Sequence, residues 1–477
     1  MSNVITTTKN DIIWNYIATF FSIGYGVIVL PMILHFLTGN EVGLNYLFLT
    51  ITSMVGLIDF GFSPQFGRNI TYALSGAKKI EREGLQCVES GEPNYYLLGI
   101  VIEAAKYIYK RMSIFVILIL MFVGTPYIYI VTHGFRDVDH SLIIWFIFCI
   151  SSYLNIYFIY YRSLLTGSGK IYESSVSIIL SKVVYILICG MMLLMGCGLF
   201  SVVIANLVAP LVQFLYSHIK FYTPKICESL PSELDKKDIR EAIVAIWYNA
   251  KKLGINSLGT FAILKMNLFF IGMFLPLSVV ASFGVLTQIV QTLSNVSAAM
   301  FMAFLPQFSS LQVQHKYREI AQKMSFTSIL YWCTFIIGGI AFVLLLPPIL
   351  TLIKTEIELP EMKVCILYLA VMLLEGNHSN FAYIISTSNK IPYVKAGLLA
   401  GFAIAALTYL VLRFTSLGLV GVVLVQGIVQ LSYNNWRWPQ YVLDDLQIGT
   451  VEFIRLGVNE FNYKTQIIYD KFRNRFL

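Results

Sequence analysis

Charged residues are scarce in this sequence: 13% of its 477 residues are Asp, Glu, Lys or Arg, against about 25% in soluble globular proteins. Its seven cysteines include no C-x-x-C pair, so neither a zinc site nor a disulfide framework is predicted. No G-x-x-x-x-G-K-S/T loop is present, so no P-loop ATPase is expected. Apolar residues make up 57% and the mean hydropathy is +0.72. These values exclude a water-soluble enzyme and a disordered chain, and predict an all-α integral membrane protein.

Long apolar runs recur along the whole chain. Each is about 18–25 residues long, enough to cross about 30 Å of hydrocarbon as a helix. Continuous runs of this length argue against a membrane barrel, whose strands alternate over about 10 residues. The first run is longer than the apolar core of a signal peptide, about 7–15 residues, so a retained span is expected there. We predict about twelve spans, at residues 12–36, 43–62, 112–131, 142–161, 174–196, 199–220, 253–274, 279–305, 325–348, 364–386, 394–412 and 418–436.

The basic residues predict the orientation of these spans. With the N-terminus in the cytoplasm, 28 of the 34 Lys and Arg residues lie on cytoplasmic segments, four lie on the outer side, and two, Lys182 and Lys265, lie within spans. Cytoplasmic segments of membrane proteins carry such an excess of Lys and Arg. Both termini are therefore predicted to face the cytoplasm, and the net charge of +8 needs no nucleic-acid partner to explain it.

The spans divide into two halves of six. We predict an N-terminal six-helix bundle at 1–222, a cytoplasmic linker at 223–242, a C-terminal six-helix bundle at 243–438, and a cytoplasmic or interfacial tail at 439–477. The halves echo each other: Ser63-Pro-Gln-Phe is expected to close the second span, and Leu305-Pro-Gln-Phe the eighth. Parallel repeats of this kind place a substrate path between the halves of a transporter.

Three charged residues lie near the middle of predicted spans, namely Lys182, Lys265 and Glu375. Each costs about 2.5–3.5 kcal/mol to place at the bilayer centre, so each is a candidate functional residue. The two lysines are candidates to line a cavity for an anionic substrate. The alternative is that one or both form a structural ion pair with Glu375.

Glu375 opens a polar patch, Glu-Gly-Asn-His-Ser-Asn, within an apolar span. A desolvated carboxylate can exchange protons near neutrality, so Glu375 is a candidate site for a coupling H⁺ or Na⁺, with His378 as a relay partner. The alternative for both residues is interhelical hydrogen bonding. Asp59, near the cytoplasmic end of the second span, is either a gate residue or an interfacial salt bridge or helix stop. No metal site, no other cofactor and no catalytic residue is predicted.

Two segments resemble the Wzx-type polysaccharide flippases of the multidrug/oligosaccharidyl-lipid/polysaccharide (MOP) exporter superfamily. The first is Leu57-Ile-Asp-Phe-Gly-Phe with Arg68 just beyond it, and the second is Lys265-Met-Asn-Leu-Phe-Phe-Ile-Gly followed by Ala281-Ser-Phe-Gly. In the family pattern the position of Asn267 is often acidic. The neutral side chain here argues against ion coupling at that position.

The resemblance implies a V-shaped carrier that works by alternating access in the bacterial plasma membrane. Its substrate would be an undecaprenyl-diphosphate-linked oligosaccharide for O-antigen, capsule or exopolysaccharide synthesis. Lys265, Lys182 and Arg68 would bind this substrate, and Asp59 with Arg68 would be gate partners. Membrane lipid, a polysaccharide polymerase and other assembly proteins are the expected partners, and nucleic acid is not.

Two other functions stay open at this stage. A MATE-like, cation-coupled multidrug exporter would have the same architecture, with Glu375 and Asp59 as its key groups. Cavity lysines argue against it, because cationic drugs prefer carboxylates. An integral membrane glycan-modifying enzyme usually presents a large polar loop, whereas the longest outer connection here, about 349–363, is short.

Overall fold

The computed structural model describes residues 9–80, 92–388 and 392–476. Within these ranges every regular element is helical, which confirms the predicted all-α class. The chain forms two compact units. Unit 1 comprises Met1–Phe261, Pro276–Ala281 and Thr355–Ile357, and unit 2 comprises Ala262–Leu275, Ser282–Lys354 and Glu358–Leu477, in each case as far as described. The division into bundles at 223–242 stays a prediction.

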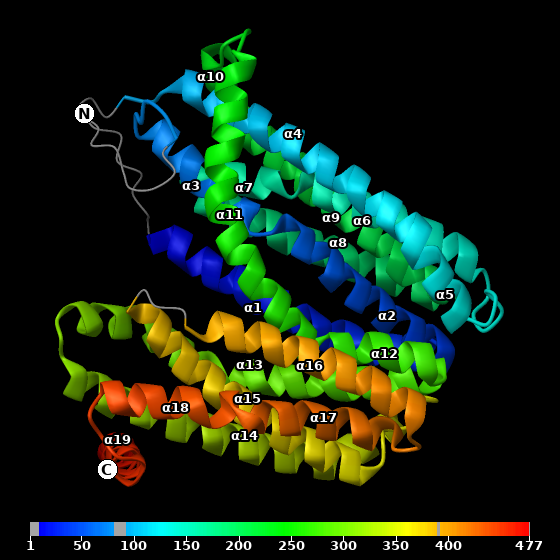
Figure 1. The fold of residues 1–477 in the computed structure, drawn as a ribbon, viewed down its shortest axis with the longest axis vertical. Coiled ribbons are helices and arrows are strands. Elements are labelled where there is room, and N and C mark those ends of the chain that lie inside the picture. The colour runs from blue at the N-terminus through cyan, green and yellow to red at the C-terminus, as the bar shows by residue number, and fades with distance from the viewer. Residues whose placement is uncertain (1–8, 81–91, 389–391, 477) are drawn as a thin grey trace. The chain divides into compact units, whose positions relative to one another are not determined.

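Unit 1 holds the helices of the first half of the chain (Figure 1). They are α1 (Lys9–Phe36), α2 (Gly39–Gly56), η1 (Leu57–Asp59), α3 (Phe62–Leu74), α4 (Tyr95–Ile119), η2 (Leu120–Gly124, a π-helical turn), α5 (Thr125–Val131), α6 (Ser141–Phe158), α7 (Tyr160–Gly167), α8 (Ile171–Leu194), α9 (Phe200–Phe221), α10 (Pro224–Ser229) and α11 (Lys236–Leu264), whose last residues belong to unit 2. The predicted linker 223–242 thus contains α10 and the first turns of α11.

Capping residues set where two of these helices begin. Thr38 caps α2: its side chain accepts a hydrogen bond from the amide of Glu41, whose carboxylate accepts one from the amide of Thr38 at 2.9 Å. Such a reciprocal pair satisfies two donors that a helix start leaves open. Asn94 caps α4 by accepting a hydrogen bond from the amide of Leu97 at 2.9 Å. α4, η2 and α5 then form one apolar stretch, Tyr95–Val131, longer than the predicted third span 112–131.

Unit 2 holds the helices of the second half. They are α12 (Met266–Phe274), α13 (Leu277–Val313), α14 (Tyr317–Ile353), α15 (Met362–Thr387), α16 (Tyr393–Phe414), α17 (Gly418–Ser432), α18 (Asn434–Asp445) and α19 (Thr450–Phe476). α15 packs against α14, α17 and α18, and α16 packs against α12 and α17. A buried core joins α13, α14, α15, α18 and α19 at one end of the unit, with Phe308, Phe381, Trp438 and Phe453 among its side chains.

All twelve predicted ranges are helical, but they do not all form simple apolar spans. Nine segments of the described chain are long and apolar enough to cross a membrane, and the bent pair Ser257–Leu264 and Met266–Phe274 is a tenth. The predicted spans 364–386 and 418–436 fall on α15, which carries the polar patch, and on α17, which ends after 15 residues at a break.

The repeated Pro-Gln-Phe motif lies inside helices and does not end them. In unit 1 it falls in the first turn of α3, and in unit 2 it falls within α13, which continues to Val313. Proline is tolerated in a first turn, where its missing N–H has no partner in any case. Phe66 and Phe308 of the two motifs are both fully buried. The apolar spans themselves run over Gly39–Asp59 and Leu277–Leu305, so each motif lies at or shortly after the end of its span, as predicted, although both motifs are helical.

Candidate substrate cavity and buried polar network

A cavity of about 420 Å³ lies inside unit 1. Side chains from α1, α2, α6, α7, α8 and α9 line it, and those with polar or charged ends are Tyr25, Asn45, Thr52, Ser151, Ser152, Asn155, Tyr161, Arg162, Ser181, Lys182, Asn206, Gln213 and Ser217. None of the described residues that line this cavity carries a carboxylate. Its two full charges are therefore both positive, and amides and hydroxyls surround them.

Lys182 contributes one of these charges from the first half of α8. Its ammonium group lies 4.0 Å from the centroid of the Tyr25 ring, which itself packs edge-on against Tyr185 at 5.7 Å. An ammonium over an aromatic face is stabilised by the ring quadrupole without losing its charge. No carboxylate within the described part of unit 1 pairs with Lys182, so its charge is available to a ligand in the cavity.

Arg162 contributes the second charge from α7, just after the break that separates α6 from α7 at Ile159. The sequence places Arg162 only at the end of an apolar run, among the residues of a cytoplasmic connection. Its role in the cavity depends on the continuation of the helix for two more turns past that break. In the sequence, a basic residue directly after an apolar run was a weak signal that Arg162 lies in the cavity.

A proline shapes the polar wall of the same cavity. Pro210 lies within α9, and a proline has no N–H to bond the carbonyl four residues earlier. That carbonyl belongs to Asn206, and it accepts a hydrogen bond from the hydroxyl of Ser151 at 2.8 Å. All three residues line the cavity, so the proline places a polar contact between α6 and α9 inside an apolar bundle.

Asp59 lies outside this cavity lining, at the break between α2 and α3. Its carboxylate accepts a hydrogen bond from the hydroxyl of Tyr109 at 2.6 Å and one from the amide of Ser63 at 3.3 Å. Arg68 is exposed and donates to the side chain of Gln65. Each side chain is thus bonded to another residue, and the two do not pair with each other. Their role as gate partners stays a prediction.

Lys265 marks a bend in unit 2. It separates α11 from α12, which meet at 42°, and its side chain is exposed. No hydrogen bond or ion pair joins this side chain to any other residue that the structure describes. The alternative in which Lys265 forms a structural ion pair with Glu375 is therefore not found, and Glu375 has other partners.

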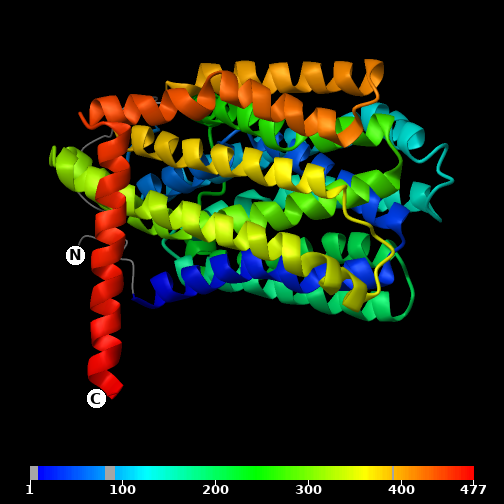
Figure 2. The same ribbon diagram turned by 90° about the horizontal axis from the view of Figure 1, so that it is seen from below.

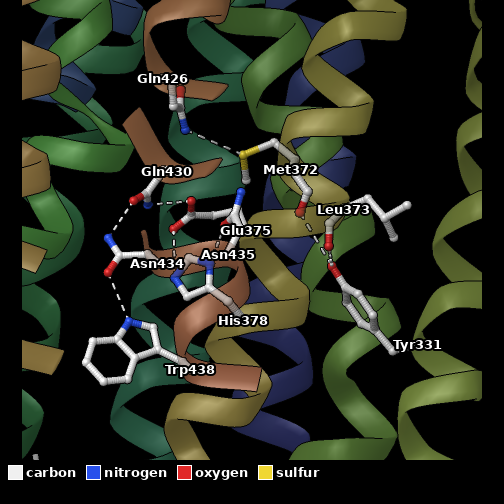
Figure 3. Close-up of polar contacts among 10 residues, drawn as sticks. All are labelled: Tyr331, Met372, Leu373, Glu375, His378, Gln426, Gln430, Asn434, Asn435 and Trp438. Carbon is white, nitrogen blue, oxygen red and sulfur yellow. Dashed lines mark hydrogen bonds and ion pairs between the residues drawn. The ribbon is translucent and has the colours of Figure 1, made fainter. Parts of the chain in front are cut away.

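Glu375 is buried in unit 2, at 7% exposure, on α15. One carboxylate oxygen, Oε2, accepts a hydrogen bond from the side-chain amide of Gln430 on α17 at 2.7 Å. The other, Oε1, lies 3.7 Å from Nε2 of His378, one turn further along α15 (Figure 3). The structure thus brings together Glu375 and His378, as their spacing of three residues on a helix predicts.

The hydrogen bonds that reach Glu375 have a fixed direction (Figure 3). The indole N–H of Trp438, which can only donate, bonds Oδ1 of Asn434 at 2.9 Å. The amide nitrogen of Asn434 must therefore donate, and it bonds Oε1 of Gln430 at 2.7 Å. Gln430 in turn directs its own amide nitrogen to Glu375. Every donor in this chain points toward the carboxylate, which it stabilises.

His378 is held from its other side by α18. Its Nδ1 lies 2.8 Å from Oδ1 of Asn435, and its Nε2 faces the carboxylate of Glu375 at 3.7 Å. The ring is therefore held between α15 and α18.

A second buried group of amides joins α12, α16 and α17. Asn267 accepts a hydrogen bond from the hydroxyl of Thr408 at 3.2 Å and donates to the side chain of Gln426 at 3.0 Å. Sequence reasoning missed Gln426, Gln430 and Asn434 as site residues. Their signal was a spacing of four, which continues to Trp438 and places all four on one face of a helix.

Comparisons with known proteins concern first the sequence and then the fold. The family described as "Polysaccharide biosynthesis protein" matches residues 8–312. Comparison of the sequence with curated proteins finds no match.

Two solved structures show the same fold. One is a multidrug resistance MATE family transporter of the MOP superfamily in an inward-facing conformation, with 12% identity, a TM-score of 0.61, and coverage of 90% of this chain and 95% of the other. The second is the lipid II flippase MurJ in an inward closed conformation, with 14% identity, a TM-score of 0.60, and coverage of 96% and 93%. At these identities the likeness concerns the fold alone.

Proposed function

Because the chain belongs to the polysaccharide biosynthesis protein family and has the multi-pass fold of MOP-superfamily transporters, we propose that it is a flippase for a lipid-linked oligosaccharide. Its substrate would be an undecaprenyl-diphosphate-linked repeat unit for surface polysaccharide. The protein would carry this unit across a bacterial plasma membrane by alternating access and leave its covalent structure unchanged.

The observation that carries this proposal is the cavity of unit 1. Lys182 and Arg162 give it two positive charges and no described carboxylate, while amides and hydroxyls make up the rest of its polar lining. A diphosphate pairs with such cations, and sugar hydroxyls hydrogen-bond to such amides. A cationic drug would meet like charge there, which disfavours a multidrug exporter as the alternative.

Two further cations are candidate contacts for the same anionic substrate. Lys265 presents an unpaired, exposed ammonium at the bend between α11 and α12. Arg68 presents an exposed guanidinium on α3. Both lie on helices next to a break, where the backbone can change direction. We assign them secondary roles in guiding the diphosphate, with Lys182 and Arg162 as the main binding pair.

For energy coupling, the Glu375–His378 pair is the strongest candidate. The carboxylate oxygen and the ring nitrogen lie 3.7 Å apart and would share one coupling proton, and the neighbours Gln430 and Asn435 come from α17 and α18. The hydroxyl of Tyr331 on α14 bonds to backbone carbonyls of α15 at 3.3–3.5 Å. Protonation would thus change the charge at a point where four helices meet. Asp59 is the matching candidate for a gate in unit 1.

Complementation tests the substrate assignment. The chain would be expressed in a bacterium that lacks its own flippase and makes the cognate lipid-linked repeat unit, as wild type, Lys182→Ala, Lys182→Arg and Arg162→Ala. We expect wild type to restore surface polysaccharide, both alanine variants to lose at least ten-fold, and Lys182→Arg to retain most of the activity because it keeps the charge.

A matched control removes a cation elsewhere. Lys363→Ala deletes an exposed lysine that pairs with Glu361 at 2.5 Å, and it should complement like wild type. Full activity of Lys182→Ala and Arg162→Ala would refute the cationic binding site. No restoration by correctly inserted wild type, together with resistance to cationic drugs, would replace the flippase with the multidrug exporter.

A gradient experiment tests the coupling. Translocation of the lipid-linked substrate would be measured in proteoliposomes with and without a pH gradient, for wild type, Glu375→Gln and the exposed control Glu361→Gln. The gradient should stimulate wild type and Glu361→Gln, and it should have no effect on Glu375→Gln. Stimulation by a Na⁺ gradient at equal pH would replace the proton by Na⁺ as the coupling ion.

A further inference from the structure

The last helix, α19, runs crosswise to α14, α15, α17 and α18 at one end of unit 2 (Figure 2). It packs on the first third of α14: an added Cβ at Gly457 would lie 2.6 Å from the carbonyl oxygen of Ser325 and 2.7 Å from the side chain of Ile329. The ammonium of Lys464 lies 4.0 Å from the ring centroid of Phe326. If α14 crosses the membrane, α19 therefore lies along the membrane plane.

The side of α19 that faces away from α14 has two different stripes. Val451, Ile454 and Val458 form an apolar stripe and are 81%, 41% and 40% exposed. Glu452, Arg455 and Asn459 form a polar stripe beside it and are also exposed. The spacing of three and four residues in each set keeps each stripe on one face of the helix. All three side chains of the apolar stripe remain exposed within the described part of unit 2, Val451 most of all.

The position of Ile454 shows which way the apolar stripe faces. It lines a cavity of about 500 Å³ together with Trp332 on α14 and Trp436 on α18. Trp332 lies seven residues beyond Ser325 along α14, about 10 Å further toward the middle of that helix at 1.5 Å per residue. The apolar stripe is therefore turned toward the middle of α14, and Trp436, 49% exposed, is of a residue type that is enriched at membrane–water interfaces.

We propose that α19 is an in-plane membrane helix whose apolar stripe is immersed in the boundary between lipid headgroups and acyl chains. Its partner is the surface of the bilayer, and anionic phospholipid is the favoured component. Lys464 pairs with Glu460 at 3.4 Å, so the positive charge comes from Arg455 and from residues 471–477, which hold three basic residues and no acidic one. Helices of this kind bind through buried apolar area together with attraction to anionic lipids.

Depth measurements on the full-length chain test this proposal. An environment-sensitive fluorophore would be attached at Val458→Cys or, as the matched control, at Asn459→Cys, with the native cysteines replaced by serine and the protein in vesicles of phosphatidylcholine with 30% phosphatidylglycerol as the probe composition. We expect blue-shifted emission at position 458 and at least three-fold stronger quenching by lipids spin-labelled near the headgroup than at position 459. Water-like emission at both positions would overturn the proposal.

A second measurement uses the natural cysteines, in case their replacement disturbs folding. Val458→Asp and Asn459→Asp place the same charge on the two stripes, and tryptic cleavage after Arg455 and Lys464 is followed in the same vesicles. Cleavage should speed up several-fold in Val458→Asp only.

Blue-shifted emission at 458 without lipid quenching, together with a cross-linked dimer, would assign the stripe to a second copy of the chain instead. Neither readout depends on transport, so failure of the flippase assignment would leave this test unchanged.

Discussion

At the scale of single residues, the most constrained group is the chain of donors from Trp438 to Glu375. Each amide in it is oriented by its neighbour, because the tryptophan at one end can only donate and the carboxylate at the other accepts. Buried amides that are fully bonded are stable, whereas one left without a partner costs about 1–3 kcal/mol. This series of hydrogen bonds therefore predicts a large loss of stability when Asn434, its central residue, is substituted.

Asn434→Leu removes the acceptor of Trp438 and the donor to Gln430. Two buried polar groups lose their partners, so the free energy of unfolding should fall by about 2–6 kcal/mol. Thermal unfolding of the purified protein in detergent measures this. Asn459→Leu changes an exposed position of α19 and is the control, which should leave the midpoint of thermal unfolding nearly unchanged. Equal midpoints for both variants would show that the series of hydrogen bonds does not stabilise the protein.

Sequence reasoning at this scale found the charges and missed the amides. Lys182, Glu375 and His378 stand out because a charge or a histidine within an apolar run is rare, and the structure places the first in a cavity and the other two side by side. Arg162 and Gln430 do not stand out. Arg162 follows an apolar run, as a basic residue of a cytoplasmic connection does, and the bond from Gln430 to Glu375 joins residues 55 positions apart, which the local spacing of four does not reveal.

At the scale of elements, breaks in the helices decide where the candidate groups lie. Asp59 precedes a break at Phe60 and Gly61, both with positive φ; glycine adopts this conformation freely, whereas Phe60 adopts it as a non-glycine residue. The breaks at Lys265 and Tyr433 contain neither proline nor glycine. Helix propensity alone predicts the first break and not the other two, because tertiary packing sets those.

The contact of α19 with α14 also belongs to this scale, and it depends on a glycine. Gly457→Ala would bring a Cβ to 2.6 Å from the backbone oxygen of Ser325, which cannot move without moving α14. Overpacking of this kind costs about 1–3 kcal/mol, so α19 should detach more often and tryptic cleavage after Lys464 in detergent should speed up. Gly449→Ala meets no atom within 4 Å and should be cleaved like wild type; equal rates in the two variants would show that the close approach does not hold α19.

At the scale of the whole molecule, hydropathy predicted the class of the protein because burial in lipid requires long apolar helices whatever their partners. All twelve ranges proved helical, although α15 and α17 are too polar or too short to be read as simple spans. The orientation of the chain in the membrane depends on the positions of Lys and Arg, and it remains to be measured.

Labelling of cysteines in intact cells measures that orientation. Cys227 is exposed on α10 and should face the cytoplasm, whereas Cys197, in the turn between α8 and α9, and Glu356 should face outward. In a Cys197→Ser chain, a membrane-impermeant maleimide should react only after permeabilisation. Adding Glu356→Cys should restore labelling of intact cells. Labelling of the Cys197→Ser chain without permeabilisation would reverse the predicted topology.

The one-way order of donors from Trp438 also determines how mutations in unit 2 combine. Trp438→Phe removes the donor to Asn434, while the carboxylate of Glu375 still orients Gln430 and, through it, Asn434. Substitution of Asn434 should therefore cost less in Trp438→Phe than in wild type, because the Trp438–Asn434 bond is already lost: these two positions should show epistasis. Gln426 lies on the same helical face but directs its amide to the sulfur of Met372 at 4.0 Å, outside that order. Its substitution should combine additively with Trp438→Phe. Double mutants along α17 and α18 would therefore distinguish two groups of hydrogen bonds that contribute independently to stability.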